Sequence, residues 1–142
     1  MDVHALLQTV RAAGGATFDH GGRPVDPGAR WLYPRHPGQT VILAASADWA
    51  AHLRSFMEAH RPLLEQEPPE WLAFGAWIHP GGDLYLDIVT GRFDEEEVRR
   101  EALRAGEREG RRVVALFQSS SGRTMPLAEK EFCADAPPIL PG

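Results

Sequence analysis

The spacing of apolar residues along the chain predicts both helices and strands. In three segments the apolar side chains recur every three or four positions, which is the spacing of a helix with one buried face. These segments are residues 2–13, 46–60 and 94–109. Short runs rich in β-branched and aromatic residues predict strands. They lie at residues 16–19, 40–45, 71–78, 84–89, 112–118 and 123–127, with a short extended piece at 31–33.

Local signals refine the ends of two of these helices. Ser46 is the predicted N-cap of the second helix. That helix should end just before Pro62 or continue only as a kinked turn, because proline has no N–H to donate. The third helix has the strongest start: Asp94 is a predicted N-cap and Phe93 is placed to pack on Val98 as a hydrophobic staple.

These elements predict one α+β domain over residues 1–135, followed by a Pro-rich flexible tail at 136–142. A chain of 142 residues is too short for its two halves each to bury a sufficient core. We expect a mixed or mostly antiparallel sheet of five to six strands, with about three helices on one face.

Charge and composition exclude several classes of protein. The chain has 15 basic and 20 acidic residues, a net charge of −5, which gives no overall basic footprint for nucleic acid. A local patch formed by the arginines of residues 99–112 is the lowest-ranked alternative, a direct nucleic-acid binder. The arginines of the third predicted helix are interleaved with glutamates, which further disfavours a nucleic-acid partner. A single cysteine, no basic leader and no long apolar run predict a cytoplasmic protein that does not enter a membrane. One lysine and no asparagine indicate a GC-rich or thermophilic host.

Four stretches in the second half of the chain carry a resemblance. They are Phe74-Gly75-Ala76-Trp77, then Gly82-Asp83-Leu84-Tyr85-Leu86-Asp87, then the acidic start of a helix, then Arg112-Val113-Val114-Ala115-Leu116-Phe117. Over residues 71–127 this order resembles small uncharacterised proteins of actinobacteria and of their phages and mobile elements. The resemblance implies a short accessory protein, often viral, and no activity is attached to it.

One cluster of polar residues could hold a metal ion. His79 and Asp83 flank the turn of the predicted hairpin, and Asp87 lies on its second strand. Converging imidazole and carboxylate groups can bind a divalent cation, which would make the protein a small metal-dependent hydrolase. Simpler interpretations remain open: Asp83 suits a turn, and Asp87 on a half-buried strand suits a partnership with an arginine. We expect no organic cofactor, because no nucleotide-binding fingerprint is present.

A second set of residues suggests a surface for a protein partner. Its members are the aromatic residues Trp31, Tyr33 and Trp71, if they are exposed, and the acidic residues Asp94, Glu95 and Glu96. The acidic residues can equally be an ordinary capped helix end, where negative charge is favoured by the helix dipole. No catalytic motif is present. The hypothesis is therefore a non-enzymatic module that binds and inhibits a host protein, such as a defence nuclease or the transcription machinery.

Overall fold

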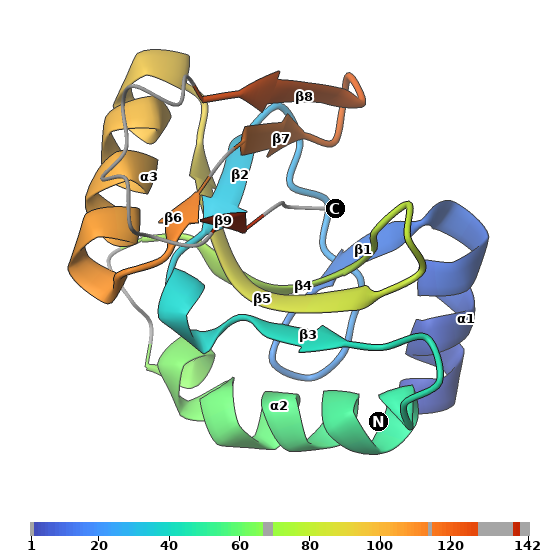
Figure 1. Cartoon of the computed structure of the whole chain (residues 1–142). Coiled ribbons are helices and arrows are strands. Elements are labelled where there is room, and N and C mark those ends of the chain that lie inside the picture. Colours follow the sequence, from blue (N-terminus) through green and yellow to red (C-terminus); the bar gives the residue numbers. More distant parts are fainter. Residues whose placement is uncertain (1, 67–69, 114, 128–137, 140–142) are drawn as a thin grey trace. The chain divides into compact units, whose positions relative to one another are not determined.

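The computed structural model describes residues 2–66, 70–113, 115–127 and 138–139 (Figure 1). Contacts within the chain group these residues into two compact units. Unit 1 combines the chain up to Asp26 with Val41–Leu86. Unit 2 combines Pro27–Thr40 with the described residues from Asp87 onward. The chain therefore leaves unit 2 directly after Thr40 and re-enters it at Asp87.

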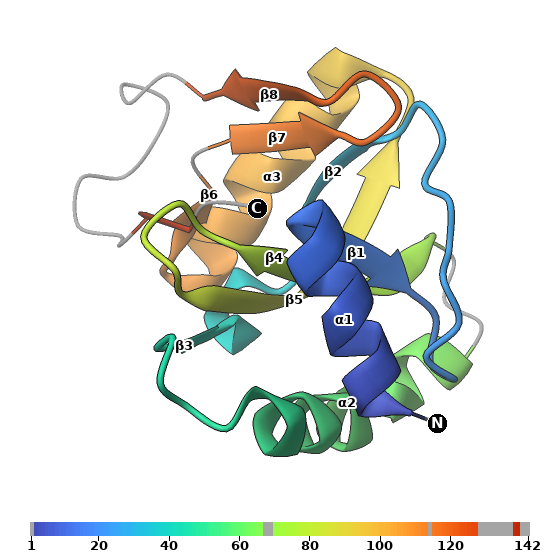
Figure 2. The same ribbon diagram turned by 90° about the vertical axis from the view of Figure 1, so that its right-hand side faces the viewer.

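Unit 1 contains two helices, three strands and the beginning of a fourth strand. Their bounds are α1 Val3–Ala13, β1 Gly15–Phe18, β3 Val41–Leu43, α2 Trp49–Glu65, β4 Leu72–Ile78 and β5 Leu84–Arg92, of which β5 continues into unit 2. Strand β1 pairs antiparallel with β4, and β3 pairs antiparallel with the first three residues of β5. Helices α1 and α2 contact each other, and both contact β4 (Figure 2).

The two helices of unit 1 begin at aspartates. The Asp2 carboxylate accepts hydrogen bonds from the backbone N–H groups of His4 and Ala5, as expected for an N-cap. The cap of α2 is Asp48, whose side chain accepts from a backbone N–H, so the prediction of Ser46 is wrong by two residues. Helix α2 also continues through Pro62 to Glu65. Proline removes only one N–H, and here that loss falls in the last turn of the helix.

The core of unit 1 is built around phenylalanines. The ring of Phe74 on β4 is fully buried. Its centroid lies 5.9 Å from the ring of Phe18 and 5.8 Å from that of Phe56 on α2. Rings at these separations and inclinations attract each other beyond simple burial. On α1 the apolar stripe faces the same interior, and its buried residues are Val3, Leu6, Leu7 and Val10.

Unit 2 contains one α-helix, a short 3-10 helix and the remaining strands. Their bounds are β2 Trp31–Pro34, η1 Pro37–Gln39, the rest of β5, α3 Glu95–Glu109, β6 Arg112–Val113, β7 Ala115–Gln118, β8 Arg123–Pro126 and β9 Pro138–Ile139. Strand β2 pairs antiparallel with both β5 and β7, and β7 pairs antiparallel with β8. Strands β5 and β7 therefore run in the same direction, joined through α3 with β2 between them.

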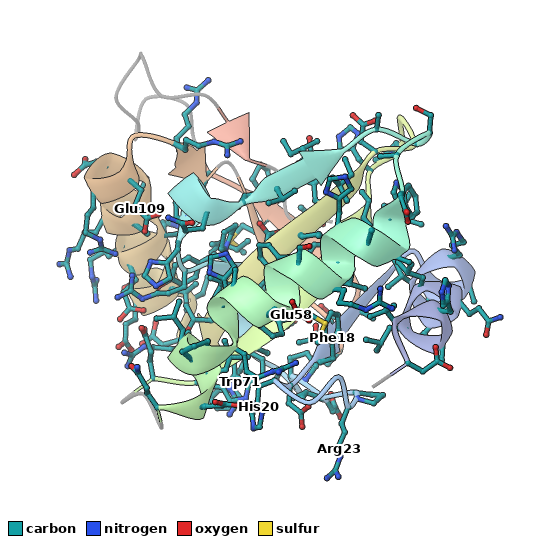
Figure 3. The ribbon with its side chains drawn as sticks, turned by 90° about the horizontal axis from the view of Figure 1, so that it is seen from below. Phe18, His20, Arg23, Glu58, Trp71 and Glu109 are labelled. Carbon is teal, nitrogen blue, oxygen red and sulfur yellow. The ribbon has the colours of Figure 1, made fainter. Side chains whose placement is uncertain are left out.

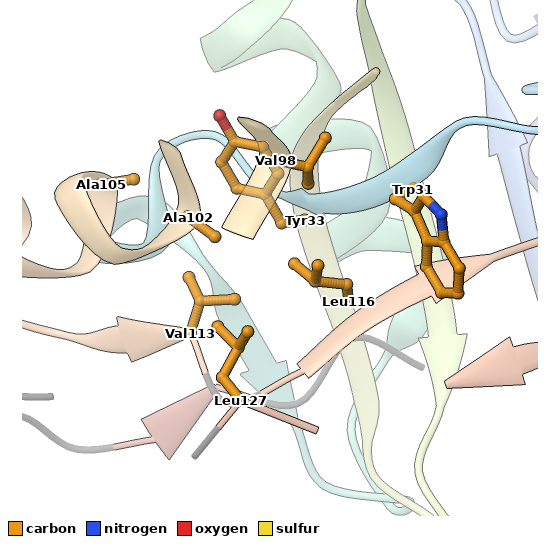
Figure 4. Close-up of a cluster of buried hydrophobic side chains, with 8 residues drawn as sticks. All are labelled: Trp31, Tyr33, Val98, Ala102, Ala105, Val113, Leu116 and Leu127. Carbon is orange, nitrogen blue, oxygen red and sulfur yellow. The ribbon is translucent and has the colours of Figure 1, made fainter. Parts of the chain in front are cut away.

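The hydrophobic core of unit 2 lies under α3 (Figure 4). Two large aromatic side chains from β2 pack there with small side chains from the helix. The buried residues are Trp31, Tyr33, Val98, Ala102, Ala105, Val113, Leu116 and Leu127. At the end of the helix, a Cβ on Gly106 would lie 3.0 Å from the Cα of Arg112. The absence of bulky residues on this face allows the helix to approach the neighbouring backbone closely.

Three α-helices and a mostly antiparallel sheet confirm the predicted α+β class. Within the described residues the sheet has seven strands rather than five or six, in the order β1-β4-β5-β2-β7-β8, with β3 also paired to β5. Strands β6 and β9 pair separately and in parallel. Strand β9 covers two residues of the predicted tail. The rest of that tail lies outside the described residues, as does Cys133.

Candidate functional site

Two of the three aromatic residues predicted to form a partner surface are in the core. Trp31 is 5% exposed and Tyr33 is 2% exposed, and both belong to the buried cluster of unit 2. Trp71, directly before β4 in unit 1, is half-buried. The expectation of an exposed aromatic patch is therefore wrong for Trp31 and Tyr33. In the sequence these aromatic residues lie in a Pro-rich stretch, which suggested an exposed loop. In the structure β2 is paired with a strand on each side. A strand of only four residues gives little sign of this in the sequence.

The acidic residues at the start of α3 are at the surface, and several have local partners. The Asp94 carboxylate caps the helix by accepting from the backbone N–H groups of Glu96 and Glu97. Arg99 lies 3.8 Å from Glu95, one helical turn away. The interpretation as a capped helix start is thus observed, while Asp94 and Glu96 remain exposed. Exposed carboxylates of this kind contribute little to stability.

Phe93, directly before this helix, is 65% exposed. It does not bury itself as the predicted staple would. Instead, the guanidinium group of Arg30 lies 4.8 Å from the centroid of its ring, a cation–π geometry. Among the described residues, Phe93 is the most exposed of the large hydrophobic side chains. The sequence did not identify Phe93 as a surface residue, because its spacing from Val98 also suited a buried contact between the two side chains.

The predicted metal-binding residues do not form a metal centre in the part of the chain that the structure describes. No group of three or more His, Cys, Asp or Glu side chains is placed there to hold an ion. The ring of His79 stacks on Tyr85 at 5.6 Å, and its Nδ1 accepts from the N–H of Gly81. The backbone oxygen of Asp83 accepts from the N–H of His79 and closes the hairpin turn.

Asp87 is the most unusual ionisable group among the described residues. Its side chain is fully buried on β5. The hydroxyl group of Thr40 donates a hydrogen bond of 2.6 Å to its Oδ1, while Oδ2 is buried without a hydrogen-bond partner. Burial raises the pKa of Asp87 from 3.8 to about 7, against the smaller lowering effects of the Thr40 hydrogen bond and the charge of Arg111. A carboxylate buried in this way loses its hydration, which favours the protonated form.

Thr40 is the last residue of a short segment, residues 36–40, called here the strap. Contacts between the strap and α3 position Thr40 beside Asp87. Glu109 at the end of α3, labelled in Figure 3, accepts from the N–H of Gly38 at 2.9 Å and lies 2.9 Å from Nδ1 of His36. Arg111 donates to the backbone oxygen of Thr40 at 3.3 Å. Two contacts with Glu109 and one hydrogen bond from Arg111 therefore connect the strap to the end of α3. One hydrogen bond, from Thr40 to Asp87, connects it to β5. All of these residues belong to unit 2.

Burial raises the pKa of Asp87 to about 7, so this carboxyl group can bind and release a proton near neutral pH although its side chain is fully buried. The sequence interpretation that Asp87 partners an arginine is supported by the electrostatic effect of Arg111. Thr40, His36 and Glu109 were not predicted. They lie 47 or more residues from their partners in this cluster along the chain, so no spacing pattern connects them. The only available signal was a carboxylate inside an apolar strand.

Comparison of the chain with protein-family models, with curated protein sequences and with solved structures found no match. Within the described residues, no helix has both the length and the apolar character needed to cross a membrane. The candidate surface and the buried cluster must therefore be interpreted from their own chemistry.

Proposed function

We propose that this chain is a non-enzymatic module that binds a host protein through a surface formed by Phe93, Asp94 and Glu96. The observation that carries the proposal is the exposure of Phe93, 65%, directly beside acidic residues that are also exposed. Aromatic side chains that insert into a partner's pocket often dominate the energy of an interface. A rim of carboxylates selects a partner whose pocket is surrounded by basic residues.

The net charge of −5 supports the same kind of partner. A negatively charged protein approaches a basic surface faster than a neutral one, because long-range attraction steers the encounter. Proteins that act on nucleic acids present such basic surfaces. We therefore propose a defence nuclease or a component of the transcription machinery as the target, and a phage or mobile element as the source of this accessory protein.

Arg30 supports the role of Phe93 in this surface. Its guanidinium group lies over the ring, which holds the exposed aromatic side chain in one orientation. A side chain that is ordered before binding loses less conformational entropy when the complex forms. Glu97 is not part of the surface, because Arg92 lies 2.9 Å from its carboxylate.

The proposal is tested with four forms of the protein: wild type, Phe93→Ala, Glu96→Lys and Ile42→Ala. Ile42 is 42% exposed in unit 1 and provides a matched control for loss of an exposed apolar side chain. Each form is immobilised and exposed to actinobacterial lysate, and retained proteins are quantified by mass spectrometry. We expect one partner that Phe93→Ala and Glu96→Lys no longer retain and Ile42→Ala retains fully.

The affinity and the effect on the partner are then measured with purified components. We expect Phe93→Ala to weaken binding roughly thirtyfold, as for a central aromatic residue of an interface. Wild-type protein should inhibit the partner's transcription or nuclease activity in proportion to occupancy. Retention of the same proteins by all four forms would contradict the proposed surface, and binding without inhibition would contradict the proposed inhibitory role.

A further inference from the structure

The strap in unit 2 is hydrogen-bonded to two acidic side chains, Glu109 on α3 and Asp87 on β5. Its two central residues, Gly38 and Gln39, are exposed, whereas Pro37 and Thr40 are buried. Every backbone N–H from Gly38 to Thr40 is hydrogen-bonded: that of Gly38 to Glu109, that of Gln39 to His36, and that of Thr40 to Pro37. The strap is thus a short ordered segment at the surface. Its last residue, Thr40, is held by its hydroxyl group's hydrogen bond to Asp87 and by a hydrogen bond from Arg111 to its backbone oxygen.

The burial of Asp87 fits a protonated carboxyl group better than an ionised one, and this effect outweighs the Thr40 hydrogen bond, which favours the ionised form. A neutral carboxyl group can remain buried with one hydrogen bond, but a carboxylate requires several donors or water. Oδ2 of Asp87 has no hydrogen-bond partner and the residue is fully buried. Burial accordingly raises the pKa of Asp87 to about 7. Ionisation near neutral pH therefore places a poorly solvated charge directly beneath the strap.

The charged and titratable groups around this position come from several elements. Arg111, after α3, attracts an ionised Asp87. Its guanidinium group is already hydrogen-bonded to the backbone oxygen of Thr40. His36, the first residue of the strap, lies 2.9 Å from the carboxylate of Glu109. The backbone N–H of Arg35 donates to Ile88, directly after Asp87 on β5. Among the described residues, only the hydroxyl group of Thr40 donates a hydrogen bond to the carboxyl group itself.

We propose that the strap is a pH-sensitive latch, closed over Asp87 when that residue is protonated and opened when it ionises. When the strap opens, water reaches Oδ2 of Asp87. The strap is the segment that moves, because its centre is exposed and it contains only one turn of 3-10 helix. Strand β5 is paired with β2 and, at its start, with β3, so local opening of β5 costs more free energy than opening of the strap. This inference does not depend on the proposed partner surface.

Amide hydrogen exchange of the strap tests the latch. Protection of the Gly38, Gln39 and Thr40 amides is measured by NMR from about pH 5.5 to about pH 8.5 and corrected for the intrinsic exchange rate. The Asp87 carboxyl carbon is followed in the same samples. In the wild type we expect protection to fall at least roughly tenfold, with the same midpoint as the carboxyl signal. In Asp87→Asn, whose amide does not ionise, protection should be independent of pH.

Three further variants separate Asp87 from other causes. Thr40→Val removes the hydrogen bond that favours the carboxylate, so the midpoint of the Asp87 carboxyl signal should move to higher pH, and strap protection should be lowered at acidic pH because the bond that holds Thr40 to Asp87 is gone. Thr40→Ser keeps a hydroxyl group and should behave as the wild type. His36→Gln removes the imidazole while leaving Asp87, and the transition should persist. Glu107→Gln is the control, because it also replaces a carboxylate with an amide, but at an exposed position of α3. It should leave the transition unchanged.

Two results would overturn the latch. One is a wild-type strap whose protection is constant while the Asp87 carbon titrates. The other is loss of the transition in His36→Gln, which would assign it to the pair formed with Glu109. If Asp87→Asn does not fold, the test rests on Thr40→Val, which should shift the Asp87 midpoint to higher pH, and on Thr40→Ser, which should not; equal midpoints in the two variants would contradict the latch.

Discussion

The cores of the two units are built from different kinds of side chains. In unit 1 the ring of Phe74 packs against those of Phe18 and Phe56, and α1 adds a buried aliphatic stripe. Unit 2 packs Trp31 and Tyr33 against small side chains. It also buries the carboxyl group of Asp87, which has no counterpart among the described residues of unit 1, where the only buried polar residue is Thr17.

This difference has consequences for stability. An apolar core gains free energy from burial at every pH, because its groups do not ionise. A core that contains a carboxyl group is stable only while that group stays neutral or finds partners for its charge. Unit 1 should therefore be sensitive to loss of volume, and unit 2 should be sensitive to pH. Four predictions test this contrast.

The largest effect is expected from Phe74→Ala in unit 1. Removing a fully buried ring leaves a cavity and should lower the free energy of unfolding by about 3–5 kcal/mol, measured by chemical denaturation. The loss should be the same at acidic and at alkaline pH. Phe93→Ala removes the same side chain from an exposed position and should change stability by less than about 0.5 kcal/mol. Similar losses for both variants would contradict the assignment of Phe74 to the core.

The second prediction concerns Asp87→Asn in unit 2. An unfolded aspartate ionises near 3.8, whereas burial raises the pKa of folded Asp87 to about 7. Between these values the folded state holds a proton that the unfolded state has released, so stability falls as pH rises. The wild type should lose up to about 4 kcal/mol relative to the Asn variant from about pH 4 to about pH 7.

The measurement is the difference in unfolding free energy between wild type and Asp87→Asn across this range. Subtracting one curve from the other removes the contribution of the other carboxylates, which both proteins share. A constant difference would show that Asp87 does not keep its proton in the folded protein. A difference that grows in favour of the wild type as pH rises would reverse the sign and indicate a well-partnered carboxylate.

Gly91→Ala should have an intermediate effect. A Cβ at this position on β5 would lie 2.6 Å from the backbone oxygen of Trp31. Because that obstacle is paired backbone rather than a flexible side chain, we expect a cost of about 1–3 kcal/mol in thermal unfolding. In Gly21→Ala the nearest atom would be at 3.4 Å, an ordinary contact, so this control should be nearly neutral. Equal behaviour of the two variants would place β2 further from β5 than described.

The smallest effects are expected at the helix caps, where the two units are alike. Asp2 in unit 1 and Asp94 in unit 2 each accept from two backbone N–H groups. Replacing either with alanine should cost about 1 kcal/mol, and asparagine should retain most of the stability. Circular dichroism during thermal unfolding measures this. A cost confined to one of the two helices would show that the other is held by packing alone.

Some features of this protein follow from short stretches of its sequence. The start of α3 at Asp94 and its end at Gly110, where φ is +70°, depend on neighbours within a few residues. The same is true of the α1 cap at Asp2. The α+β class follows from the spacing of apolar residues. The predictions of the α+β class and of a helix start at Asp94 held because the interactions responsible for them are local in the chain.

Other features depend on contacts between distant residues. The burial of Trp31 and Tyr33 follows from pairing of β2 with both β5 and β7. Alternation along residues 84–89 predicted a half-buried strand, whereas β5 is buried on both faces at Asp87. The strap depends on Thr40 and Asp87, 47 residues apart. Only the tertiary structure removes the carboxyl group from water, because desolvation depends on every neighbour at once and leaves no pattern in the chain.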